Sequence, residues 1–547
     1  MKDFFKENIL LFILLILCLF WLFIYAGHYS GILIDFGREV YYPQEILNGK
    51  VLYKDLFNIY GPLSYQINAI LYKLFGAKLS TLYGAGICTS LLTISGIYLI
   101  GQKFLSKTLS CIIGFFTFSV GILTTSIFNF HFPYSWAVIY GLIAFLFSLY
   151  FLLNYTENKD GKNLYISSFL AGFAITCKYD FLLFALIVLF FIIKSKNWKA
   201  LLCFCFMPLL SFGTLFLQGL RLNDLINSLL ITSQMAKSKT LTYFYQNSGI
   251  YFNPKAILTD FILLLKFAIP VCAMFYGKYL ADKKRVPAII LSVIGCLFFV
   301  FTFNVKYSLG FLPILLLVFL GIEIFNITVK KTKFDLKLII LLTSALAVCA
   351  KVFWVLLLGS YGNYYVSVAL IAFFAFIFKY FPKNFESVAG NLVILMSLLC
   401  IFTNVSTINF TNNKISTQKG TIYTQKSYAT STNKLIEYLK TQTNMDDKVV
   451  IFPEGMTVNF LADRKSDDFY NSLLPLYIET FGEERIIEHY KKEMPEYIIL
   501  NNLDMKDYYF RYICQDYALR FCEFVNNNYN LENIIDNEFR YLIFKRK

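Results

Sequence analysis

Long apolar segments recur along the first 406 residues and are separated by short polar ones. Many of them approach the roughly 20 residues that a helix needs to cross a bilayer. Because only helices and closed barrels satisfy their backbone groups in lipid, the pattern predicts a polytopic α-helical membrane protein with about 13 transmembrane helices. The predicted spans are 9–27, 81–101, 108–128, 134–154, 164–177, 181–194, 200–219, 257–277, 287–304, 308–328, 338–358, 363–381 and 388–405.

The first apolar segment, residues 9–27, has the length of a secretory signal peptide as well as that of a membrane span. It has no small-x-small cleavage site, and many similar segments follow it. We therefore interpret it as a retained helix.

Two long connections, residues 28–80 and 220–256, each contain an amphipathic stretch. Their apolar residues recur at helical spacing, so each stretch predicts a helix. Such a helix either lies in the membrane interface or packs against the bundle. The apolar positions are Leu63, Ile67, Ile70, Leu71 and Leu74 in the first connection and Leu222, Leu225, Ile226, Leu229 and Leu230 in the second.

Residues 407–547 differ in kind from the rest of the chain. Three of its stretches are short and apolar, as buried strands are: KVVIFPEG, PEYIILNN and FRYLIFKRK. Helical stretches lie between them. The alternation predicts a small α/β domain. The chain is therefore expected to divide into a transmembrane domain, residues 1–406, and a C-terminal domain, residues 407–547.

The formal net charge of +15 comes from the membrane part. Residues 1–406 contain 32 Lys and Arg against 15 Asp and Glu, whereas residues 407–547 contain 18 against 20. Nineteen of the 32 basic residues lie in segments that become cytoplasmic if the amino end is inside. The positive-inside rule then predicts a cytoplasmic amino terminus and an extracytoplasmic C-terminal domain. Because the basic excess belongs to the membrane part, we expect membrane lipids rather than nucleic acid as partners.

Charged residues at the outer ends of the spans are the candidate functional residues, because charge near lipid is costly without a partner or a purpose. The stretch LIDFGREVYYPQEIL sets Asp35 and Glu39 around Arg38 just after the first span. A simpler interpretation is one acid at a helix start and one solvated acid that pairs with Arg38. The remaining candidates are Lys178, Asp180, Arg221, Lys237, Lys239, Lys351, Tyr364 and Tyr365.

Each of these further candidates also has a plain structural interpretation. Lys178 and Asp180 could form an ordinary turn between two short spans, and Lys237 and Lys239 could be solvated loop residues. Lys351 lies inside the span 338–358 and must face a partner or a wet cavity. Together the candidates predict an outward-facing cavity. In such a cavity a carboxylate can take a proton from a hydroxyl, and cations can hold a phosphate.

The 12 cysteines add little. Ten lie in or beside apolar spans, where cysteine behaves as a small hydrophobic residue. Cys514 and Cys522 can form a bridge only if the chain turns between them, because eight residues of helix would separate them by about 12 Å. No cysteine or histidine spacing resembles a zinc site.

The stretch DFGREVYYPQEILNGKVLYKDLFNIYGPLSY resembles the first outer loop of GT-C membrane glycosyltransferases. It is most similar to bacterial glycosyltransferase family 39 proteins, which are related to protein O-mannosyltransferases and to the lipid A aminoarabinose transferase. The stretches AGFAITCKYD and GSYGNYYVSVAL, the thirteen-span plan and the C-terminal α/β domain also fit this family.

The resemblance implies an enzyme of the bacterial inner membrane. Its donor would be a sugar on a polyprenyl phosphate, its acceptor a protein, a glycan or a lipid, and the transfer would invert the anomeric centre. Asp35 matches the acid after the first span and would act as general base or hold the acceptor. Glu39 is the nearest second acid, because Phe36 stands where many relatives have one.

The resemblance also assigns roles to residues of the later loops. Lys178 would contact the lipid phosphate or line the pocket. Tyr364 and Tyr365 align with a segment that often carries His or Arg before a Tyr, and here Asn363 precedes them. Some relatives use a divalent cation, but the sequence offers no ligand set of its own.

Two other functions compete with sugar transfer. A transporter or flippase of lipid-linked sugars would need charge near the bilayer midplane and internal repeats. Lys351 is the main midplane candidate, and no clear repeat is present. A non-catalytic envelope-assembly partner would not need Asp35 at all.

Overall fold

The computed structural model describes residues 8–547 except 30, 34, 282, 332–333 and 467–468. Every predicted span coincides with a helix. These helices are α2 (Ile9–Tyr25), α5 (Leu79–Gly101), α6 (Lys107–Gly121), α7 (Trp136–Asn158), α8 (Gly161–Cys177), α9 (Leu182–Ser195), α10 (Trp198–Leu217), α13 (Pro254–Leu280), α14 (Arg285–Thr302), α15 (Leu312–Thr328), α16 (Leu336–Cys349), α17 (Gly362–Tyr380) and α18 (Glu386–Ile408). The predicted polytopic helical fold is therefore confirmed.

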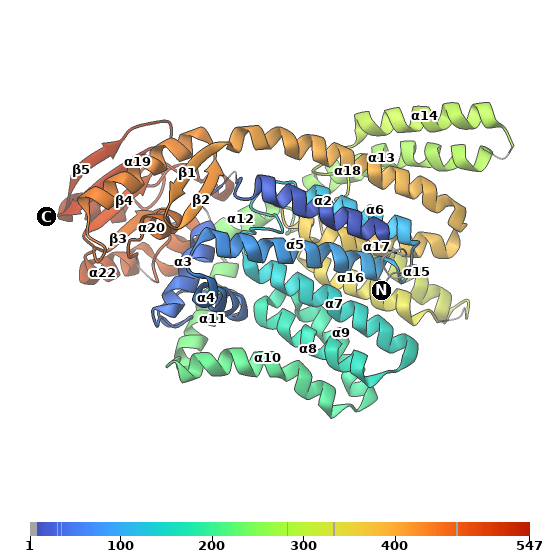
Figure 1. Ribbon diagram of the computed structural model, residues 1–547, viewed down its shortest axis with the longest axis horizontal. Coiled ribbons are helices and arrows are strands. Elements are labelled where there is room, and N and C mark those ends of the chain that lie inside the picture. Colours follow the sequence, from blue (N-terminus) through green and yellow to red (C-terminus); the bar gives the residue numbers. More distant parts are fainter. Residues whose placement is uncertain (1–7, 30, 34, 282, 332–333, 467–468) are drawn as a thin grey trace.

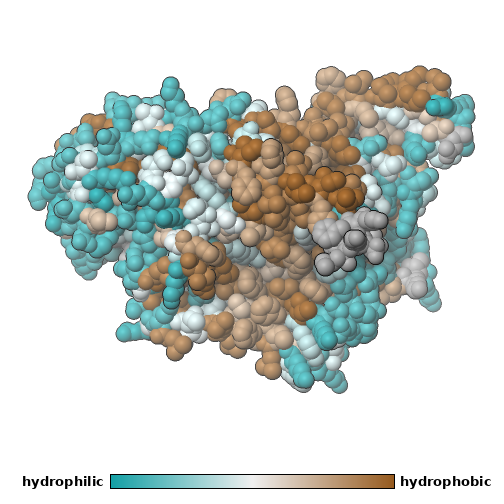
Figure 2. Space-filling view, in the orientation of Figure 1, coloured by the Kyte–Doolittle hydropathy of each residue, from teal (hydrophilic) through white to brown (hydrophobic). Residues whose placement is uncertain are grey.

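These helices form a bundle with the C-terminal α/β region at one end, and the hairpin of α13 and α14 lies along one edge (Figure 1). Within the described residues, seven helices are long and apolar enough to cross a bilayer, and α2, α6 and α15 are apolar but shorter. On the face drawn in Figure 2, apolar surface covers the bundle and hydrophilic surface lies at both ends. Large apolar side chains of the bundle are exposed, Phe301 at 85% and Phe402 at 79%, as in an integral membrane protein.

Two predicted spans end earlier than the hydropathy suggests. Helix α6 ends at Gly121, and residues 122–135 form a buried irregular segment in which the Asn129 side chain accepts the His131 backbone N–H at 3.1 Å. Helix α16 ends at Cys349, and a short 3₁₀ turn, Ala350–Val352, follows. Apolar composition continues past both ends because these segments are buried in protein, where backbone groups bond to neighbouring loops.

Four helices lie between the bundle and the C-terminal region: α3 (Phe36–Leu47), α4 (Leu63–Phe75), α11 (Leu222–Ala236) and α12 (Lys239–Asn247) (Figure 1). The apolar sides of α4 and α11 are exposed, with Leu74 at 66% and Leu222 at 62%. Helix α4 instead buries Tyr65, Asn68 and Tyr72. Of the two interpretations of these helices, the exposure favours a place in the membrane interface.

The C-terminal region contains a four-stranded sheet in the order β3-β4-β6-β5, with only β3 and β4 parallel. The three predicted strands are β3 (Val449–Phe452), β4 (Tyr497–Asn501) and β6 (Tyr541–Arg546). The unpredicted strands are β1 (Asn413–Thr417), β2 (Gly420–Thr424) and β5 (Tyr529–Ile535), and the helices are α19 (Lys426–Gln442), α20 (Met456–Ala462), α21 (Pro475–Phe481), α22 (Glu483–Glu493) and α23 (Leu519–Asn528).

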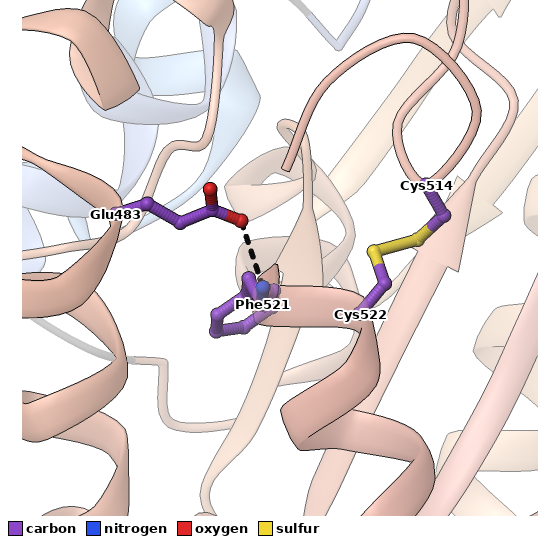
Figure 3. The surroundings of a disulfide bond; sticks show 4 residues. All are labelled: Glu483, Cys514, Phe521 and Cys522. Carbon is purple, nitrogen blue, oxygen red and sulfur yellow. Dashed lines mark hydrogen bonds between the residues drawn. A yellow bond between two sulfur atoms is a disulfide. The ribbon is translucent and has the colours of Figure 1, made fainter. Parts of the chain in front are cut away.

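Cys514 and Cys522 form a disulfide bond (Figure 3). The chain turns between them, since the Cys514 backbone N–H donates to the Tyr517 carbonyl at 2.9 Å before α23 begins. This turn is the condition that the sequence set for a bridge, and it brings the two Cα atoms to 5.6 Å. The Glu483 carboxylate accepts the Phe521 backbone N–H at 2.8 Å and thereby joins α22 to α23.

Helix α3 fixes the C-terminal region onto the bundle. Gly37 lies against α20 so closely that a Cβ there would be 2.8 Å from the Thr457 nitrogen, so no larger residue fits. The Thr457 hydroxyl donates to the Ile32 carbonyl at 2.5 Å, and the Tyr41 hydroxyl accepts the Ser466 backbone N–H at 2.9 Å. The residues that begin α3 are therefore held from both sides.

Candidate active site at the junction of the bundle and the C-terminal region

Asp35 immediately precedes α3 and has a φ of 60°, in the left-handed region that few residues other than glycine adopt. Its carboxylate forms an ion pair with Arg38, one turn along the helix. The Asp35 side chain is 26% exposed, whereas that of Arg38 is 7% exposed. An unusual backbone conformation that presents a carboxylate to an opening is typical of a functional site.

The C-terminal region supplies the other half of this cluster. Glu454, in the turn after β3, accepts the Asp35 backbone N–H at 2.8 Å and the Ser472 hydroxyl at 3.1 Å. The Tyr477 hydroxyl of α21 accepts a hydrogen bond from Arg38 at 3.0 Å. Burial and the charge of Asp35 raise the pKa of Glu454 to about 7. We call Asp35, Arg38, Glu454 and Tyr477 the acid cluster.

Glu39 has a different environment from Asp35. Its carboxylate is fully buried and accepts the Tyr65 hydroxyl and the Trp136 backbone N–H, both at 3.0 Å. Trp136 is the first residue of α7, so Glu39 satisfies a free N–H at a helix start, where a negative charge is favourable. Burial raises the pKa of Glu39 to about 7. Glu39 therefore attaches α3 to α7 rather than facing the opening.

A second group of charges lies where the helices α8, α16 and α17 end or begin. Asp180 accepts from Lys351 at 3.3 Å and from the Tyr365 hydroxyl at 3.3 Å, and its carboxylate lies 3.6 Å from the Lys178 ammonium. Lys178 is buried and donates to the Tyr134 hydroxyl at 2.5 Å. We call Lys178, Asp180 and Lys351 the lysine cluster.

The lysine cluster has more positive than negative charge. Burial and the nearby Lys351 ammonium lower the pKa of Lys178 to about 7, although Asp180 acts in the opposite direction. Two lysines around one carboxylate leave a net charge of about +1 when both lysines are protonated. Such a site can accept an additional anion.

Tyr60 lies between the two clusters. Its ring centre is 4.7 Å from the Lys178 ammonium, a cation–π contact. Burial raises the pKa of Tyr60, and the charges of Arg38 and Asp35 also act on its hydroxyl. Tyr60 thus contacts the lysine cluster and lies within electrostatic range of the acid cluster.

The structure brings together some of the candidate residues and not others. Five candidates belong to the two clusters: Asp35, Arg38, Lys178, Asp180 and Lys351. A sixth, Tyr365, contacts the lysine cluster because its hydroxyl donates to Asp180. Arg221, Lys237 and Lys239 are exposed, and no ion pair joins them to either cluster in the part of the chain that the structure describes. Tyr364 is buried, and its hydroxyl donates to the Asn129 carbonyl at 3.4 Å.

Lys351 lies outside the helix in which the sequence pattern placed it. Because α16 ends at Cys349, Lys351 lies past the last turn of that helix and is paired with Asp180. Its partner is thus 171 residues away in the chain. The residue that favoured a transporter belongs instead to the cluster at the end of the bundle.

Sequence reasoning missed Glu454, Tyr477, Tyr60 and Tyr134. Glu454 lies in the predicted turn of KVVIFPEG, where an acid is ordinarily solvated, yet it is 6% exposed. A Pro-Glu-Gly turn directly after a buried strand was the available signal. Among the described residues, no group of three or more His, Cys, Asp or Glu side chains is placed to hold a metal ion.

Residues 60–219 match the family of dolichyl-phosphate-mannose-protein mannosyltransferases. The match confirms the predicted resemblance over this part of the chain, which contains Lys178 and Asp180 but not Asp35. No curated protein matches the chain.

Two solved structures are similar to the chain at low identity. One is the oligosaccharyltransferase of Archaeoglobus fulgidus in complex with zinc and sulfate, at 14% identity and a TM-score of 0.47, which covers 91% of this chain and 69% of that one. The other is ArnT from Cupriavidus metallidurans bound to undecaprenyl phosphate, at 12% identity and a TM-score of 0.42, which covers 97% of each chain.

Proposed function

We propose that this protein transfers a sugar from a polyprenyl-phosphate-linked donor to an acceptor hydroxyl at the extracytoplasmic face of the membrane. The observation that carries the proposal is the presence of a partly exposed, held carboxylate and of two lysines, one of them buried, near Tyr60 at one end of a membrane bundle. The match of residues 60–219 to a mannosyltransferase family that uses dolichyl phosphate supports the same reaction.

In this reaction Asp35 is the general base. It accepts the proton of the acceptor hydroxyl as the acceptor oxygen bonds to the anomeric carbon, and the bond from that carbon to the phosphate oxygen breaks. Arg38 and the Glu454 contact to the Asp35 backbone orient the carboxylate. One base suffices for a direct displacement, which inverts the anomeric centre.

Lys178 and Lys351 hold the phosphate that departs with the electron pair. An ion pair in a site with little water is stronger than in bulk water, so the buried Lys178 ammonium and the nearby Lys351 ammonium favour the leaving anion. Asp180 keeps the two lysines together while the site is empty of phosphate. The apolar surface of the bundle lets the lipid part of the donor remain in the membrane.

The proposal places residues 1–406 in a transferase domain and residues 407–547 in an extracytoplasmic domain of a bacterial inner-membrane protein. The distribution of basic residues supports a cytoplasmic amino terminus. The disulfide between Cys514 and Cys522 supports an oxidising compartment for the C-terminal region.

The test is sugar transfer by the full-length protein in lipid vesicles, with a set of synthetic polyprenyl-phosphate hexoses as donors. We expect Asp35→Asn to lower transfer by about 100-fold or more. The matched control is Asp446→Asn, a carboxylate 90% exposed on the C-terminal region, which should transfer as the wild type does.

Full activity of Asp35→Asn would overturn the assignment of the base. Movement of the intact donor across the vesicle membrane without any transfer by the wild type would overturn the transferase and favour a transporter. Absence of both movement and transfer, with cell-envelope defects of a deletion strain that Asp35→Asn corrects as fully as the wild type does, would favour a non-catalytic partner.

A further inference from the structure

A pocket of about 500 Å³ lies beside the acid cluster on the hydrophilic end of the molecule. Helices α12 and α21 and the segment before α23 enclose it. Five aromatic side chains line it, and we call it the tyrosine pocket: Tyr243, Tyr508, Tyr509, Phe510 and Tyr517. Neither the base nor the lysine cluster of the proposed reaction uses these residues.

The walls of the pocket are held in place. The Glu479 carboxylate of α21 accepts the Lys239 and Thr240 backbone N–H groups at 2.7 and 3.0 Å and so caps the start of α12. Ring centres lie 5.2 Å apart for Tyr243 and Tyr509. The disulfide closes the turn that carries Tyr517 (Figure 3). A pocket whose walls are fixed before binding loses little entropy on ligand entry.

One polar group in the pocket has no partner. The Tyr517 side chain is 7% exposed, and its hydroxyl makes no hydrogen bond to any residue that the structure describes. A buried hydroxyl without a partner raises the free energy of the unbound protein, so a ligand that hydrogen-bonds to it binds more tightly. This is a position for a hydroxyl or carbonyl of a bound molecule.

Helix α21 connects the pocket to the acid cluster, because Pro475 and Ile478 line the pocket and Tyr477 between them accepts a hydrogen bond from Arg38. Burial raises the pKa of Tyr508, and the charges of Asp35 and Glu454 raise it further. Burial also raises the pKa of Tyr517, and Glu454 adds to that effect. The hydroxyls of both tyrosines therefore lie within electrostatic reach of the acid cluster.

We propose that the tyrosine pocket binds a sugar ring of a carbohydrate acceptor and directs one of its hydroxyls toward Asp35. This inference rests on the proposed function. A pyranose ring has an apolar C–H face that suits an aromatic ring and a rim of hydroxyls that suits tyrosine O–H groups. A peptide acceptor would more often bind along a strand edge, and no strand contributes to the described lining of this pocket.

The test is binding of simple carbohydrates to the full-length protein in lipid nanodiscs, followed by saturation-transfer NMR. The probes are the methyl glycosides of glucose, galactose, mannose and N-acetylglucosamine, and the competing class is a peptide that contains Ser and Thr. We expect at least one glycoside to bind. Tyr243→Ala and Tyr517→Phe should each weaken its binding by about threefold to tenfold.

Two further variants serve as controls for this test. Tyr243→Phe keeps the ring and should bind the glycoside nearly as the wild type does, which separates loss of the aromatic face from misfolding. Tyr512→Phe is the matched control, since Tyr512 belongs to the same segment but does not line the pocket. Absence of binding by all four glycosides, equal binding by all variants, or displacement of the glycoside by the peptide would overturn the inference.

The outcome is distinguishable from failure of the proposed function. Asp35→Asn should bind the glycoside as the wild type does and yet transfer no sugar. Loss of transfer in Asp35→Asn together with unchanged glycoside binding in Tyr243→Ala would overturn only the tyrosine pocket. Glycoside binding that depends on Tyr243, without any transfer by the wild type, would overturn the transferase.

Discussion

The acid cluster and the lysine cluster both lie near Tyr60 but are built differently. The acid cluster joins the start of α3 to residues of the C-terminal region, and its carboxylate is partly exposed. The lysine cluster is built within the bundle, from the ends of membrane helices, and Lys178 in it is 3% exposed. A partly exposed carboxylate suits an acceptor that arrives from water, whereas a buried lysine such as Lys178 suits a phosphate that arrives from the membrane.

This difference teaches that the two halves of the proposed reaction can be separated by substitution. If the acid cluster serves chemistry and the lysine cluster serves donor binding, substitutions in one cluster should change turnover and those in the other should change affinity.

Asp35→Asn should lower kcat by about 10²–10⁴-fold and leave donor affinity within about twofold, because the general base does not contact the donor phosphate. Donor affinity is measured by titration of a polyprenyl-phosphate hexose into the protein in nanodiscs. A large loss of donor affinity in this variant would contradict the division of roles.

Lys178→Met should weaken donor binding by about 30-fold or more, because it removes one partner of a buried charge-assisted contact. Lys237→Met is the matched control, since Lys237 is exposed and lies outside both clusters. Thermal unfolding of both variants shows whether Lys178→Met is folded. Unchanged donor affinity in a folded Lys178→Met variant would exclude this lysine as a phosphate contact.

Glu454→Ala should lower transfer by about tenfold and destabilise the fold by about 1–3 kcal/mol, because it leaves the partly buried Asp35 N–H without an acceptor. Glu454→Gln keeps an acceptor oxygen at this place and should recover most of both losses. Transfer rates and thermal unfolding measure the two effects. If Glu454→Gln is as impaired as Glu454→Ala, the charge of Glu454 itself is needed.

Donor affinity should fall by up to about tenfold as the pH rises from 6.5 to 8. The pKa of Lys178 is lowered to about 7, so its ammonium form, which binds the phosphate, is present below that pH and is lost above it. The phosphodiester of the donor keeps its charge over this range. Affinity titrations at both pH values test this, and Lys178→Met should show a flatter dependence. A rise in affinity with pH would contradict the sign.

The local features of the fold could be predicted from the sequence because they depend on near neighbours along the chain. Thirteen apolar segments of about bilayer length were predicted as helices, and each overlaps a helix of the structure. Three short apolar stretches correctly predicted β3, β4 and β6. Strand β5 was missed, since its sequence YNLENII is polar and five of its seven residues are exposed. The ends of α6 and α16 were missed because buried loops have the composition of helices.

The sequence by itself determined the membrane fold, the candidate charges Asp35, Lys178, Asp180 and Lys351, and the region that resembles a glycosyltransferase. Only the tertiary structure decided which of them meet. Asp35 contacts Glu454 across 419 residues, and Lys351 contacts Asp180 across 171. The tertiary structure also gives Asp35 and Glu39, which are four residues apart in the sequence, different partners: Asp35 pairs with Arg38, and Glu39 accepts from Tyr65 and Trp136. Periodicity records which side of a helix is buried, but a contact between distant segments depends on how the whole chain packs.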